Sequence, residues 1–111
     1  DHRDLHSFPT RRSSDLAQEI FRLKQAFGAG IVEVVIWQVP EPVPPSEHPY
    51  KYRLVYVVNG RRVLGYDNER GKGDHKHVLG REEFYRFVSP KQLMADFMAD
   101  LEVHSHERTN S

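Results

Sequence analysis

The dipeptide Asn59-Gly60 limits the fold of this chain more than any other short feature. It separates residues 50–58 from residues 61–67, two runs that are rich in β-branched and aromatic residues. Asn-Gly between such runs is typical of a two-residue type I′ turn, because both turn positions require a positive φ. The sequence therefore predicts an antiparallel hairpin in which Val58 pairs with Arg61.

The register of this hairpin predicts which side chains share a face of the sheet. Alternate residues of a strand point to opposite faces, and directly paired residues point to the same face. A regular register places Lys51 and Arg53 on one face together with Tyr66 and Asn68, and it places Asp67 on the other face. We therefore expect a basic and aromatic cluster at the open end of the hairpin.

Further segments have strand character. Residues 31–39, IVEVVIWQV, predict a strand, whereas the five prolines of residues 40–49 predict a stiff, extended loop. Shorter strands are expected at residues 75–79 and 84–88. Residues 17–27 fit both a helix and a strand, and their spacing alone leaves the two alternatives open.

The C-terminal part of the chain predicts a helix. Ser89 followed by Pro90 is typical of a helix start, with serine as the N-cap and proline in the first position. Apolar residues at helical spacing follow, namely Leu93, Phe97 and Leu101. Asp96 and Asp100 are expected on the solvated side. The predicted fold class is α+β, a small antiparallel sheet of hairpins with about four to five strands covered by this helix.

The length of 111 residues suits one domain, which we place at residues 17–103 and which a polar tail, residues 104–111, follows. Acidic and basic residues both number 16, so strong non-specific attraction to nucleic acid is not expected. Cysteine is absent, which excludes disulfides. No apolar run is long enough to span a membrane, and we expect a cytoplasmic protein.

The N-terminal segment has an unusual sequence. Residues 6–16 read HSFPTRRSSDL, which looks like a translated sequencing adapter. We therefore expect residues 1–16 to be an adapter-derived, disordered artefact, and we exclude them from the predicted fold.

Polar residues are densest in residues 67–77, DNERGKGDHKH, where we expect the chemistry. Gly71 and Gly73 flank Lys72, so that backbone N–H groups and the lysine can approach a phosphate closely. A flexible, solvated turn is the alternative interpretation.

His75 and His77 are two residues apart, so both imidazoles point to one face of an extended segment. They can act as acid and base in phosphodiester cleavage, because the ordinary pKa of histidine lies near neutrality. The pair can instead ligate a metal, with Asp67 or Asp74 as the third ligand. A purely structural pair is the third alternative.

Four stretches of the chain together resemble one known family. They are the pattern W-x-V-P-x-P-V-P-x-S-x-H, the string KYRL, the string GYDNERGKGDHKH, and the helix that begins at FVS. On these residues the chain resembles the TumE family of toxins, roughly over residues 19–102. Members commonly begin with a strand and a turn, which favours a hairpin for residues 17–27.

The TumE resemblance implies a toxin of a bacterial, type II-like toxin–antitoxin system, with a helix-turn-helix antitoxin encoded nearby as its partner. By analogy with other small toxins we hypothesise that RNA is the substrate and that the protein is a metal-independent ribonuclease without a cofactor. The alternative is a non-enzymatic binding module that inhibits its target stoichiometrically.

The ribonuclease hypothesis gives each candidate residue an expected role. The catalytic set, which moves protons and stabilises charge, comprises His75, His77, Asp67 and Lys72. The set that holds substrate and phosphate comprises Lys51, Arg53, Tyr66, Asn68, Arg70, Gly71 and Gly73. No metal ligand is assigned, because in-line attack by a ribose 2′-hydroxyl needs only cationic side chains to stabilise the phosphorane.

Overall fold

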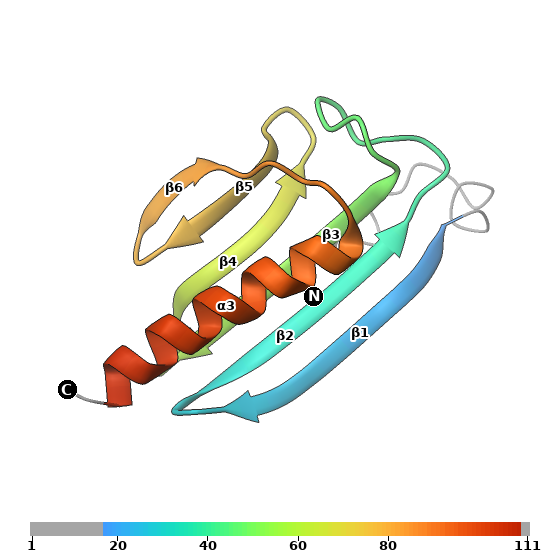
Figure 1. The fold of residues 1–111 in the computed structure, drawn as a ribbon. Helices are drawn as coiled ribbons and strands as arrows, with labels where there is room; N and C mark the ends of the chain where they lie inside the picture. Colours follow the sequence, from blue (N-terminus) through green and yellow to red (C-terminus); the bar gives the residue numbers. More distant parts are fainter. Residues whose placement is uncertain (1–16, 110–111) are drawn as a thin grey trace.

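The chain folds into one antiparallel β-sheet with a single long helix across one of its faces (Figure 1). The computed structural model describes residues 17–109, with side chains described as far as His104. The strands follow one another in the sheet in chain order: β1 (Gln18–Phe27), β2 (Gly30–Gln38), β3 (Tyr50–Val58), β4 (Arg61–Glu69), β5 (Gly73–Val78) and β6 (Arg81–Phe84). The helix is α3 (Pro90–Thr109). The α+β class is confirmed, but the sheet has six strands instead of the predicted four to five.

Residues 18–27 form a strand, as the family resemblance favoured. β1 pairs along its whole length with β2. Gly30, at the start of β2, is packed so tightly that a Cβ atom there would lie 2.3 Å from the carbonyl oxygen of Val57. A glycine at this position therefore allows β2 to approach β3. Within residues 17–109, no helix is long and apolar enough to cross a membrane.

The β5–β6 turn differs from the prediction. Leu79 and Gly80 form it, with φ angles of 50° and 87°. Leucine rarely adopts a positive φ, so only Gly80 marks this turn in the sequence, and Leu79 was placed in the preceding strand. The predicted strand at residues 84–88 is wrong, because β6 ends at Phe84 and the next residue, Tyr85, turns into the core.

Helix α3 begins where the sequence predicts it. The backbone N–H of Gln92 donates to the Ser89 hydroxyl oxygen at 3.0 Å, which is the expected N-cap. Leu93, Phe97 and Leu101 are buried, and the Phe97 ring packs edge-on against Tyr66. The helix continues to Thr109, so most of the predicted tail at residues 104–111 is helical.

Two carboxylates of α3 bind the sheet. Tyr85 donates a hydrogen bond of 2.5 Å to Asp96, and Tyr66 donates one to Asp100. Burial and these hydrogen bonds raise the pKa of both tyrosines above the ordinary value. The prediction that Asp96 and Asp100 are merely solvated is wrong, because each accepts a hydrogen bond from the hydroxyl group of a buried tyrosine.

A β-bulge in β4 changes which side chains share a face. Val58 pairs with Arg61 as predicted, but the register then shifts and leaves Val63 as the extra residue. Beyond the bulge, Asp67 pairs with Arg53 and points to the face opposite α3, which we call the outer face. Tyr66 and Asn68 point towards α3 instead. The predicted grouping of Tyr66 and Asn68 with Arg53 is therefore wrong.

Candidate functional site

The outer face collects charged side chains from four adjacent strands. In the cross-strand pairing, Arg53 lies opposite Asp67, and Asp67 lies opposite His75. His77 pairs in the same way with Glu82 of β6. Directly paired residues share a face, so these strands bring together residues that are up to 29 positions apart in the sequence.

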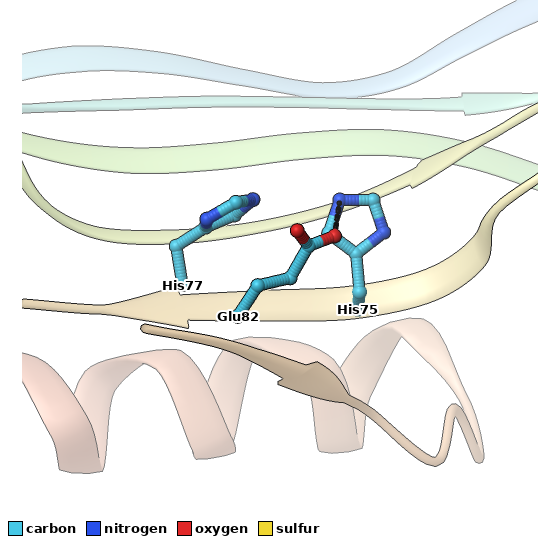
Figure 2. A group of neighbouring side chains, drawn as sticks. All are labelled: His75, His77 and Glu82. Atoms are coloured by element: carbon cyan, nitrogen blue, oxygen red, sulfur yellow. Dashed lines mark ion pairs between the residues drawn. The ribbon is translucent and has the colours of Figure 1, made fainter. Parts of the chain in front are cut away.

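His75 and His77 lie side by side, as their spacing predicts. Their ring centroids are 5.2 Å apart and the rings are nearly perpendicular. Figure 2 shows that the carboxylate of Glu82 reaches between them from β6, and its Oε2 lies 3.5 Å from His75 Nε2. Glu82 had not been predicted, because its strand was placed three residues too late.

A pocket of about 300 Å³ opens on the outer face around this pair. Its lining combines cations, carboxylates and both imidazoles with two uncharged residues: Lys51, Tyr52, Arg53, Arg62, Asp67, Asn68, Glu69, Lys72, His75 and His77. Most of the predicted catalytic and phosphate-binding residues are therefore brought together here. Tyr66 is not among them, since it is buried under α3.

His75 is the more enclosed of the two imidazoles, with a side chain that is 5% exposed. Its Nδ1 lies 3.0 Å from the carbonyl oxygen of Gly73, and its Nε2 lies 2.6 Å from Asp67 Oδ1. The second contact is not aligned as a hydrogen bond, because Asp67 Oδ1 is buried without a hydrogen-bond partner. Both ring nitrogens therefore face oxygen atoms that can only accept.

His77 is more accessible and makes no hydrogen bond to the described part of the chain. Burial, and then the positive charge of Arg62, lower the pKa of His77 below its ordinary value. Arg62 reaches this position because Gly65 has no side chain: a Cβ atom on Gly65 would lie 3.0 Å from Arg62 Cδ. Arg62 was missed in the sequence, where nothing marks the bulge that brings Gly65 to the same face.

Lys72 bridges two carboxylates at the edge of the pocket. Its Nζ lies 2.9 Å from Glu82 Oε2 and 3.8 Å from Glu69 Oε1. The hydrogen bond with Glu82 raises the pKa of Lys72 and lowers the pKa of Glu82. The predicted lysine is therefore present in the pocket, but it is engaged with acidic partners.

The comparison with protein families identifies the chain's family. The family model described as Toxin TumE matches residues 3–105. The chain belongs to the TumE toxin family. Membership places it among the toxins of toxin–antitoxin systems, which act with an antitoxin partner. No curated protein and no solved structure matches the chain. The match includes most of residues 1–16, which lie outside the described residues, so their adapter origin stays a prediction.

In this TumE-family chain, the glycine-containing turn is not arranged as a phosphate cradle. The N–H of Gly71 already donates to the carbonyl oxygen of Pro44 at 2.9 Å. Gly73 is buried against Pro45, and its carbonyl oxygen faces His75. Arg70 is exposed in the turn and does not line the pocket. Contacts with Pro44 and Pro45 of the proline-rich loop therefore occupy Gly71 and Gly73, which the sequence suggested for phosphate binding.

Asp74 and Asn68 have structural partners. Asp74 accepts hydrogen bonds from Ser46 at 2.5 Å and Tyr52 at 2.7 Å, and it pairs with His48 at 2.6 Å. Burial acts to raise the pKa of Asp74, but these partners outweigh it and lower the pKa. Asn68 is 1% exposed and accepts from the N–H of Tyr52. Asp74 as a metal ligand beside the two outer-face histidines is therefore wrong, because it points to the opposite face.

Proposed function

We propose that this TumE-family toxin cleaves RNA in the outer-face pocket. One observation carries the proposal: the pocket joins an imidazole pair to the cationic side chains of Lys51, Arg53 and Arg62. An RNA backbone presents phosphates that such cations bind, and arginine can hold two phosphate oxygens at once. With a net charge of zero over the whole chain, this local set of cations supplies the attraction.

The proposed reaction is an in-line attack by a ribose 2′-hydroxyl on the adjacent phosphorus. The O2′–P bond forms and the P–O5′ bond breaks, which leaves a 2′,3′-cyclic phosphate and a 5′-hydroxyl. His77 is placed to accept the 2′-hydroxyl proton, because it lines the pocket and is not engaged in a hydrogen bond to the described residues. Arg53 and Arg62 stabilise the additional negative charge of the phosphorane, and the departing oxygen takes its proton from solvent.

The test uses the purified full chain and a defined RNA, followed on denaturing gels with analysis of the product ends. We expect multiple turnovers and cyclic phosphate ends. His77→Gln should slow cleavage by about 100-fold, the size of a general-base contribution, and Arg53→Ala by about tenfold. Lys91→Ala is the matched control, because Lys91 is an exposed cation at the start of α3 and outside the pocket.

Intact RNA together with growth arrest would contradict the proposed cleavage. If inhibition of a cellular target then titrates at one toxin per target, the protein is a stoichiometric binding module. That outcome is the alternative that the sequence left open.

We also propose that a helix-turn-helix antitoxin neutralises the toxin by covering the outer-face pocket. A cationic pocket favours an acidic partner surface. Arg53→Glu should weaken the purified complex measurably, whereas Lys91→Glu should leave its affinity unchanged. Equal affinity of both variants would place the antitoxin elsewhere on the toxin.

A further inference from the structure

The imidazole of His75 is held so that its Nε2 faces carboxylate oxygens. A carbonyl oxygen can only accept a hydrogen bond, so the contact with Gly73 fixes the proton of the ring on Nδ1. In the neutral ring, Nε2 then carries a lone pair and no proton. The atoms around it are carboxylate oxygens: Asp67 Oδ1 at 2.6 Å, Glu82 Oε2 at 3.5 Å and Glu69 Oε1 at 4.0 Å.

Asp67 provides the second, independent observation. Among residues 17–104, its Oδ1 is the one buried side-chain oxygen or nitrogen atom without a hydrogen-bond partner. Native proteins rarely leave a buried carboxylate oxygen unsatisfied, because the desolvated charge is costly. Although this oxygen and His75 Nε2 are close, they are not aligned along an N–H bond. The lone pair of His75 Nε2 and the buried Oδ1 of Asp67 can therefore both coordinate one cation.

We infer that Asp67, Glu69 and His75 bind one divalent transition-metal ion in the outer-face pocket. The ligand atoms of these three residues all lie within 4.8 Å of one another. Histidine ligands commonly donate their other ring N–H to a backbone carbonyl, as His75 does to Gly73. An imidazole together with two carboxylates suits Mn²⁺ or Zn²⁺ better than Mg²⁺ or Ca²⁺, which prefer oxygen ligands throughout.

The local charges agree with a divalent ion. Lys72 Nζ lies 2.9 Å from Glu82 and 3.8 Å from Glu69, so its single charge compensates Glu82 more than Glu69. Asp67 and the longer-range partner Glu69 supply two negative charges to a divalent ion. The three protein ligands leave coordination positions open towards the pocket, as is usual for metal sites that receive water or substrate. The sequence had assigned no metal ligand, and its alternative placed both histidines with Asp67 or Asp74 around a metal. The inferred set keeps His75 and Asp67 and has Glu69 in place of His77.

The inference is tested without RNA, so it can fail or succeed independently of the proposed cleavage. The full chain is treated with EDTA, dialysed and titrated with MnCl₂ and ZnCl₂ by calorimetry, and its Tm is measured with each ion. We expect one ion per chain and a rise in Tm on the order of 10 °C at about a hundredfold excess over Kd. MgCl₂ and CaCl₂ should produce much smaller shifts.

Variants assign the bound ion to the proposed ligands. Asp67→Asn and Glu69→Gln should each weaken binding at least tenfold, and the exposed Glu69 can be changed without affecting the core. Glu33→Gln is the matched control, because Glu33 is an outer-face carboxylate paired with Lys24 and outside the proposed set. His104→Gln controls for adventitious binding by a histidine outside the pocket.

Two results would overturn the inference. If none of the ions raises Tm, these three residues hold no metal ion. If Asp67→Asn and Glu69→Gln bind as tightly as Glu33→Gln, the ion lies elsewhere. The visible spectrum of bound Co²⁺ in the unaltered chain gives a second measurement that needs no variant, because coordination by an imidazole changes the ligand-field bands. A spectrum identical to aqueous Co²⁺ counts against the site.

Discussion

Replacing Gly65 by alanine separates the contribution of Arg62 to the pocket from the stability of the sheet. The new Cβ atom would lie 3.0 Å from Cδ of Arg62, 3.5 Å from its Nε and 3.6 Å from one terminal nitrogen, and no backbone atom outside the immediate neighbours comes as close. Arg62 is exposed and flexible, so it can move away while the strands stay in place. The methyl group therefore displaces the guanidinium group from its position over Gly65, next to His77.

The expected change in stability is small and favourable. Gly65 lies in a paired strand and its φ is not positive, so alanine fits the backbone. Removing glycine from a strand stabilises the folded chain by about 0.5–1 kcal/mol, because the unfolded chain loses conformational freedom. Tm should stay constant or rise by about 4–8 °C in a domain of this size.

The expected loss of function is larger. A hydrogen bond to a charged group contributes about 1.5–3 kcal/mol, which corresponds to roughly 10- to 100-fold in rate. Growth arrest after induction, scored as colony formation, measures toxicity without assuming a substrate, and RNA cleavage measures the proposed activity. Arg62→Ala should reproduce the loss, and the double variant should lose no more than either single variant, since both act through one side chain.

Two results would refute this reasoning about Gly65. A fall in Tm would show that the methyl group disturbs the strands themselves. Losses that add in the double variant would show that Gly65 acts on the pocket independently of Arg62.

Three further predictions concern stability, each measured as the free energy of unfolding in urea. Asp74→Asn should cost about 2–4 kcal/mol at neutral pH. The pKa of Asp74 is lower in the folded chain than in the unfolded chain. The stabilisation by Asp74 is therefore complete above the unfolded pKa of about 4, and it is lost as the pH falls from there through the folded pKa. Asp74→Asn should lose less stability in acid than the unaltered chain, and equal acid sensitivity of the two would contradict the assignment. Tyr66→Phe should cost about 1–2 kcal/mol, because Asp100 loses its hydroxyl donor, and an unchanged midpoint would show that this bond contributes nothing. Gly30→Ala should cost more than about 2 kcal/mol, because its Cβ atom would lie 2.3 Å from the carbonyl oxygen of Val57, a backbone atom that cannot rotate away. A stability equal to that of the unaltered chain would mean that β2 and β3 separate easily.

Local signals predicted the parts of this fold that depend on neighbouring residues. Asn59 and Gly60 both have a positive φ, and Ser89 caps α3. Both features depend only on the backbone of the residues involved and of their immediate neighbours. The pairing of His75 and His77 on one face follows from strand geometry alone. These predictions needed no knowledge of the tertiary structure.

Features that depend on distant partners could not be predicted in the same way. The Leu79-Gly80 turn contradicts the ordinary preference of leucine and forms because β5 and β6 pair on either side of it. Glu69 and Glu82 appear as ordinary surface charges in the sequence. Only the pairing of β4, β5 and β6 brings both close to His75.

The bulge at Val63 connects the core and the pocket. In an unbroken strand, the alternation that buries Leu54 would place Tyr66 on the outer face and would direct Asp67 towards α3. The one extra residue reverses both positions. Tyr66 is thereby buried against Phe97, and Asp67 is brought to 2.6 Å from His75 Nε2. A single insertion in β4 therefore supplies an aromatic ring to the core and a carboxylate to the site, so selection on either face constrains the other.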